Sequence, residues 1–193
     1  MVDTFKEIIY CIPNNCGHLP SVKQTIDKVK EICENLTVYE GLLVNIESVY
    51  RPFRETEHLL IIYDDMYTDI INSRSFCHFA TFGSRHHNTS LIITTQNIFE
   101  TSTYAKTIRR QFQYYTIFYP ASDRQMLLTL GRNLFPLNSS CLLNCFRKLI
   151  PHTSNAFEQY ILIDVDPKSK LPYGMRLRSN VFSQYPYFFI TDE

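Results

Sequence analysis

Two adjacent carboxylates follow a short apolar run in the first half of the chain. Leu59–Tyr63 is an unbroken apolar segment of strand length, and Asp64 and Asp65 come directly after it. A strand buried on both faces of a parallel sheet has this composition, and its carboxyl end opens onto the ligand crevice of the sheet. There the first carboxylate can hold the hydration shell of a magnesium ion, and the second can orient an attacking water. The pattern also suits a core strand whose acids only begin a helix, since acids stabilise the first helical turn.

A second apolar strand with a polar end follows about one crossover later. It is predicted over Ser90–Thr95, and Gln96 and Asn97 come directly after it. In ATPases of the additional-strand type, the strand beside the Walker B acids ends in a polar sensor that contacts the γ-phosphate or the attacking water. Gln96, or its neighbour Asn97, would be that group, although such residues also end strands as turn formers. Taken together, the two strand ends favour an ATPase core with Leu59–Asp65 as its Walker B strand.

The polar loop Gly83–Asn88 lies between these two strands and holds three further candidates. Arg85 can reach a phosphate on a neighbouring subunit, as arginine fingers do. His86 and His87 are possible metal ligands by type, but adjacent residues of an extended chain point to opposite faces and seldom share an ion. Histidines that pack the loop are therefore the favoured interpretation.

The elements that must position these side chains alternate along the sequence. Short apolar runs alternate with helical patterns, which predicts an α/β fold with a mostly parallel sheet flanked by helices. Strands are expected over Glu7–Ile12, Leu36–Tyr39, Leu59–Tyr63, Ser90–Thr95 and Tyr114–Tyr119, with a final pair over Gln159–Asp164 and Met175–Arg178. Helices are expected from Pro20 onward and over Met66–Phe82, Tyr104–Gln111, Ser122–Leu130 and Ser140–Leu149. The segment Leu42–Phe53 is ambiguous.

Composition places the chain among intracellular proteins. A length of 193 residues with 45% hydrophobic content suits one domain with a substantial core, and the formal net charge is zero. No pair of the six cysteines has the CxxC spacing of zinc sites, and Cys141 and Cys145 are expected to share one helix face. The sequence shows no secretory signal and no apolar run of membrane-spanning length. We therefore expect free thiols, a reducing compartment (cytoplasm or nucleus) and no membrane partner.

Longer stretches of the sequence resemble one family. The segments LLIIYDDMY, FCHFATFGSRHHNTSLIITTQNIFE and YYTIFY look like the genome-packaging ATPases of the FtsK/HerA-like group, in the version of Maverick/Polinton elements and adintovirus-like viruses. PLNSSCLLNCFRKLIPHTSNAFEQYILIDVDP and MRLRSNVF are similar to that family's C-terminal part. The resemblance covers the chain from about Glu7 to Phe182, and SRHHNTSLIITTQNIF is its most specific piece. It implies ATP and Mg²⁺ as cofactors, with Asp64 in the magnesium shell. It also implies assembly with like or intact ATPase subunits, and double-stranded DNA and capsid proteins as partners.

The sequence departs from the family at the phosphate-binding loop. There a GxxxxGK[ST] segment precedes the strand that appears here as EIIYCIP, and its backbone N–H groups, Lys and Ser/Thr hold phosphate and magnesium. Only Met1–Lys6 precede that strand here, and the five glycines of the chain stand alone. The missing strand would lie between Ser90–Thr95 and Tyr114–Tyr119, so its loss leaves both with an open edge. We therefore expect one truncated P-loop NTPase domain (RecA-like) over residues 1–193, with a sheet core at 7–135 and a helix and strand pair at 136–193.

Three functions remain open at this point. The first is a fragment or degenerate copy of a viral or mobile-element DNA-packaging ATPase, with little or no hydrolysis by the isolated chain. The second is a non-catalytic subunit that assembles with intact ATPase subunits and contributes Arg85 to them. The third is a metal-dependent nuclease or a transposon-associated enzyme that uses Asp64 and Asp65 with His86 and His87, which requires these side chains to converge on one ion.

Overall fold

The computed structural model describes residues 5–33, 35–45, 58–86, 88–153, 155, 158–172, 175–184 and 186–189. The chain forms two compact units, Met1–Gln111 and Phe112–Glu193, and each unit contains its own four-stranded sheet. Among the helices in these described ranges, none is long and apolar enough to cross a bilayer. The ambiguous segment Leu42–Phe53 falls mainly outside the described residues.

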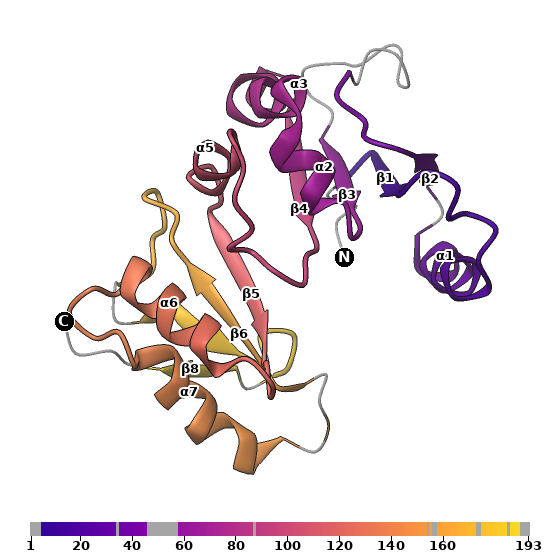
Figure 1. Ribbon diagram of the computed structural model, residues 1–193. Coiled ribbons are helices and arrows are strands. Elements are labelled where there is room, and N and C mark those ends of the chain that lie inside the picture. Colours follow the sequence, from indigo (N-terminus) through magenta and orange to yellow (C-terminus); the bar gives the residue numbers. More distant parts are fainter. Residues whose placement is uncertain are drawn as a thin grey trace. The chain divides into compact units, whose positions relative to one another are not determined.

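The first unit is built around a parallel sheet (Figure 1). Its strand order is β2-β1-β3-β4, and all three neighbouring pairs are parallel. The strands span Glu7–Ile12 (β1), Leu36–Glu40 (β2), Leu59–Tyr63 (β3) and Thr89–Ile93 (β4). Parallel neighbours need crossover connections, and α1 (Pro20–Ile32) supplies the one between β1 and β2.

Both faces of the two central strands are buried. On one face, Tyr10 of β1 packs with Ile26 of α1. On the other face, Ile61 and Tyr63 of β3 have no exposed surface, and the Tyr63 ring meets Phe76 edge-on at a centroid distance of 5.1 Å. The prediction that the apolar run before the two acids is a strand buried on both faces is therefore confirmed.

The single helix predicted over Met66–Phe82 is wrong, because Ser73 interrupts it. Ser73 has extended backbone angles, and its hydroxyl accepts a hydrogen bond from Phe76 N at 3.1 Å, so it caps a new helix. Helical structure also extends into the segment predicted as the loop Gly83–Asn88. The observed segments are α2 (Tyr67–Asn72), α3 (Arg74–His78), the π-helical η2 (Phe79–Gly83) and α4 (Ser84–His86). The helix α5 (Ala105–Arg109) follows β4 and ends the unit.

The second unit contains an antiparallel sheet with the order β5-β6-β7-β8. Its strands span Tyr114–Phe118 (β5), Tyr160–Asp164 (β6), Leu177–Ser179 (β7) and Tyr187–Phe189 (β8). The helices α6 (Arg124–Leu134) and α7 (Cys141–Leu149), followed by the short η3 (Ile150–His152), lie on one side of this sheet (Figure 1).

The core of the second unit lies between its helices and that side of the sheet. Ile161 and Ile163 of β6 are fully buried, and the ring of Phe146 on α7 lies 5.3 Å from the ring of Tyr119. Within the helical layer, α6 and the chain before α7 approach closely at Gly131. A Cβ atom at this glycine would lie 2.1 Å from the backbone oxygen of Ser139.

The predicted α/β class with a parallel sheet and flanking helices is confirmed for the first unit, and the final antiparallel strand pair for the second. The expected place of the strand at Tyr114–Tyr119 differs from what is observed. It was expected in the same sheet as Ser90–Thr95, but β5 pairs with β6 in the other sheet. A strand that lacks the parallel neighbour expected at its side can satisfy its backbone groups with an antiparallel one. The assignment of the whole chain to a single P-loop domain stays a prediction.

Candidate functional site

The parallel sheet has a change of direction beside β3. From β1 the chain goes to β2 on one side, and β3 and β4 follow on the other side. Ligand crevices of parallel sheets lie outside the carboxyl ends of the strands at such a point. Asp64 comes directly after β3, and its backbone N–H donates to the Cys11 carbonyl of β1 at 3.0 Å. The first of the two predicted acids is therefore held where this crevice begins.

Hydroxyl groups from both neighbouring strands bind the Asp64 carboxylate. Tyr10 of β1 donates its O–H to Oδ2 at 2.5 Å, and Thr94, directly after β4, donates its O–H to Oδ1 at 2.7 Å. Burial, together with this hydrogen bond and the Asp64 charge, raises the pKa of Tyr10, so its hydroxyl stays a donor at neutral pH. A carboxylate has about four acceptor positions, so Asp64 keeps capacity for further ligands.

Thr94 also fixes the second acid. Its backbone N–H donates to the Tyr63 carbonyl at 2.9 Å, and its hydroxyl oxygen accepts the backbone N–H of Asp65 at 3.0 Å. Asp65 has a φ of 52°, in the left-handed region that few residues other than glycine occupy. The backbone conformation at Asp65 consequently determines the direction of its side chain, and this side chain is exposed.

A cavity of about 260 Å³ opens beside these strand ends. Asp65 and Gln96, two of the predicted site residues, both line it, as does Asn97, the alternative sensor. Asp64 is not among its lining residues, although it is the residue expected to hold magnesium. The cavity is lined by Asp65, Tyr67, Thr68, Thr95, Gln96, Asn97 and Glu100.

The sequence analysis missed four residues of this cavity, which are Tyr67, Thr68, Thr95 and Glu100. The Thr68 hydroxyl of α2 lies 3.1 and 3.0 Å from the two carboxylate oxygens of Glu100. The loop that carries Glu100 is held by Arg109 of α5, whose guanidinium donates to the carbonyls of Ile98 at 2.8 Å and Glu100 at 3.1 Å. Thr68 directly follows the segment LLIIYDDMY and Glu100 ends the segment FCHFATFGSRHHNTSLIITTQNIFE, but no spacing pattern in the sequence indicates that they join Asp65.

The candidates of the Gly83–Asn88 segment are only partly described. The backbone of Arg85 belongs to α4, but its side chain and all of His87 lie outside the described part of the chain. The His86 ring packs on Phe82 with centroids 4.1 Å apart. Among the described residues, no three His, Cys, Asp or Glu side chains gather in a way that could hold a metal ion.

The donor types at the cavity fit one of the two implied cofactors better than the other. Carboxylate, hydroxyl and amide oxygens, the groups present on Asp65, Thr95 and Gln96, are the ligands that magnesium prefers. A triphosphate needs a loop of backbone N–H groups with a lysine, and the sequence contains no GxxxxGK[ST] segment. The residues that line this cavity thus offer oxygen ligands of the type that magnesium takes, and they include no phosphate-binding loop for ATP.

The comparisons with known proteins add no relative. Models of protein families, curated proteins and solved structures were all searched with this chain, and no match was found. The resemblance to packaging ATPases accordingly rests on the sequence segments quoted above.

Proposed function

We propose that this chain supplies the magnesium-and-water half of the nucleotide site of an FtsK/HerA-like genome-packaging ATPase. In this proposal Asp64 and Asp65 are the Walker B acids and Gln96 is the sensor amide. The phosphate-binding half has to come from a segment that this sequence does not contain. The isolated chain therefore hydrolyses ATP feebly or not at all.

The observation that carries this proposal is the meeting of the two predicted strand ends. Asp65 after β3 and Gln96 after β4 line the same cavity, and Thr94 binds both acids. Walker B and sensor residues have to share such a position, because both act on the terminal phosphate and the attacking water. A core strand whose acids only begin a helix would not require the amide at the end of β4.

The order of the strands is a second support. In additional-strand ATPases the order is 5-1-4-3-2, so the sensor strand, the Walker B strand and the strand after the phosphate loop are neighbours. The order β4-β3-β1 reproduces that sequence of neighbours. On this interpretation the phosphate-loop strand belongs beside β4, which within the described residues pairs only with β3. In the assembled site, the residues present here would hold a proton-accepting carboxylate and an orienting amide near the attacking water.

The test joins a segment that contains GxxxxGK[ST] to the N-terminus of the chain. Magnesium-dependent ATP hydrolysis is then measured for the extended product and for the present chain. We expect turnover from the extended product only, and a fall in kcat of about 10²–10³-fold with Asp64→Asn, the size of losing one preorganised electrostatic group. If the present chain hydrolyses ATP and Asp64→Ala abolishes this hydrolysis, the idea that its phosphate-binding half is missing is contradicted. Full activity of the extended Asp64→Asn variant would contradict the role of the acid.

One observation favours the second candidate, a non-catalytic subunit that assembles with intact ATPase subunits. Within the described residues β4 pairs on one side only, and its apolar sequence includes none of the charges or prolines that usually protect an edge strand. Such an edge suits pairing with another chain. Co-sedimentation with a phosphate-loop-bearing packaging ATPase tests this function. A chain that stays monomeric in that mixture excludes it.

A further inference from the structure

The sheet of the second unit has one covered and one open face. Side chains alternate along β5 so that Tyr114, Thr116 and Phe118 are exposed while Tyr115 and Ile117 between them are half-buried. On β6 the residues Ile161 and Ile163, which share the face of Tyr115 and Ile117, are fully buried. An antiparallel sheet with helices on one side normally presents polar residues on the other. Here four of the eight residues that the strand registers place on that other face are aromatic.

The strand registers place four aromatic rings on the open face. Phe118 is opposite Tyr160, and their ring centroids lie 5.9 Å apart. Tyr114 lies two pleats further along β5, and Phe188 of β8 is opposite Arg178 on the same face. Tyr114, Phe118 and Phe188 have 51%, 56% and 40% of their surface exposed. We call Tyr114, Phe118, Tyr160 and Phe188 the aromatic face.

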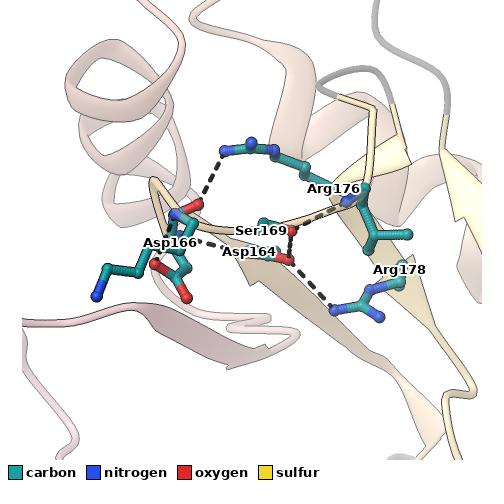
Figure 2. A network of polar contacts seen from close by, with 7 residues as sticks. Asp164, Asp166, Ser169, Arg176 and Arg178 are labelled. Atoms are coloured by element: carbon teal, nitrogen blue, oxygen red, sulfur yellow. Dashed lines mark hydrogen bonds and ion pairs between the residues drawn. The ribbon is translucent and has the colours of Figure 1, made fainter.

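Figure 2 shows a polar network at the end of β6, where Asp164 is opposite Tyr114 of the aromatic face. The buried Asp164 carboxylate accepts the Ser169 hydroxyl at 2.6 Å and the Asp166 backbone N–H at 3.1 Å. Arg178 reaches the same carboxylate only at 3.8 Å. Its Nε is buried and has no acceptor among the described residues. The Arg178 side chain is 22% exposed, and the strand registers place it on the same face as the aromatic rings.

The chain between β6 and β7, with the residues that flank it, carries an excess of positive charge in the sequence. From Asp164 to Arg178 the sequence carries two lysines, two arginines and two aspartates, an excess of two positive charges. The rest of the second unit carries four basic and four acidic residues. Exposed rings beside a local positive excess are complementary to a ligand that has both flat apolar faces and negative charges.

We propose that the aromatic face binds single-stranded nucleic acid, with bases stacked on its rings and phosphates near Arg178. Stacking on aromatic side chains along a basic surface is the general mode of single-strand binding. In a duplex the bases are stacked on one another, so a duplex can interact only with the charged groups of this surface. An apolar protein segment can interact only with its aromatic rings. This surface is separate from the nucleotide site proposed above, and neither proposal depends on the other.

The test measures the fluorescence anisotropy of a labelled single-stranded oligo(dT) of 20 nucleotides titrated with the full chain. Phe118→Ala and Tyr114→Ala are each expected to weaken binding by about tenfold, the usual effect of losing one stacked base. Both side chains are more than half exposed, so the fold is expected to survive, which circular dichroism checks. Phe182→Ala is the matched control, because Phe182 is 96% exposed and lies outside the sheet.

Three results would overturn the proposal. The first is no binding of oligo(dT), and the second is an equal loss of affinity with Phe182→Ala. The third is duplex DNA that binds as tightly as the single strand, because charges alone would then explain the affinity. If sedimentation shows self-association that Phe118→Ala abolishes, the face is an interface between copies of this chain and the proposal also fails.

Discussion

Thr94 gives the sharpest test of how the candidate site is built. Its hydroxyl donates to Asp64 Oδ1 at 2.7 Å and accepts from Asp65 N at 3.0 Å, so one side chain joins the end of β4 to both acids. Thr94→Val removes both hydrogen bonds while it preserves the shape and the strand preference of the side chain. The change therefore measures the contribution of the hydroxyl group alone.

The expected cost follows from these two hydrogen bonds. A hydrogen bond to a charged group contributes about 1.5–3 kcal/mol, and one between neutral groups about 0.5–1.5 kcal/mol. Both lie where water can replace them in part, which lowers the sum. We expect Thr94→Val to reduce the free energy of unfolding by about 1–2 kcal/mol. Thr95→Val, which removes one acceptor for Asn97 N at 3.2 Å, is expected to cost about 0.5 kcal/mol.

Urea unfolding followed by circular dichroism measures both variants, together with Asp64→Asn and the double variant Asp64→Asn/Thr94→Val. Because Thr94 and Asp64 touch, the two effects are expected to be non-additive by about 0.5–1 kcal/mol. Equal costs for Thr94→Val and Thr95→Val, or additive effects in the double variant, would refute the idea that Thr94 positions the acids.

Three further outcomes are expected. Tyr63→Phe leaves the buried Leu43 carbonyl without the hydroxyl that donates to it at 2.6 Å, so the free energy of unfolding falls by about 1–3 kcal/mol in urea. Gly131→Ala forces a Cβ atom against the Ser139 carbonyl oxygen, so thermal unfolding shifts to lower temperature, whereas Gly17→Ala displaces only the end of a flexible side chain. Burial raises the pKa of Tyr10, so the folded state keeps a proton that the unfolded chain releases. The contribution of Tyr10 to stability is unchanged below about pH 10 and falls above it. Tyr10→Phe therefore makes the loss of stability smaller in urea midpoints measured between pH 8 and pH 11.

The sequence predicts the central part of the fold well. The unbroken apolar run of β3 and the apolar strand before Gln96 have the length and composition of buried parallel strands, and both form neighbouring strands of one sheet. The position of Asp65 and Gln96 at one cavity follows from the same reasoning, because the carboxyl ends of parallel neighbours meet at one edge.

Other features depend on contacts that no local pattern contains. Glu100 joins the cavity because Arg109 of α5 holds its loop, which is a matter of tertiary packing. The pairing of β5 depends on which strands are available as neighbours, and a short apolar run does not specify its partner. The break at Ser73 did have a local signal, since serine is a strong helix N-cap, but the apolar spacing of the segment outweighed it.

The order of strands in the first sheet also determines how the chain can fold during synthesis. β1 lies between β2 and β3, so one side of it stays unpaired until β3 has left the ribosome. The two strands are separated by the stretch from Ile12 to Leu59, which takes about 2–10 s to synthesise at usual translation rates. During that time a strand made almost entirely of apolar residues has an open edge. The nascent protein is thus expected to depend on chaperones until β3 arrives.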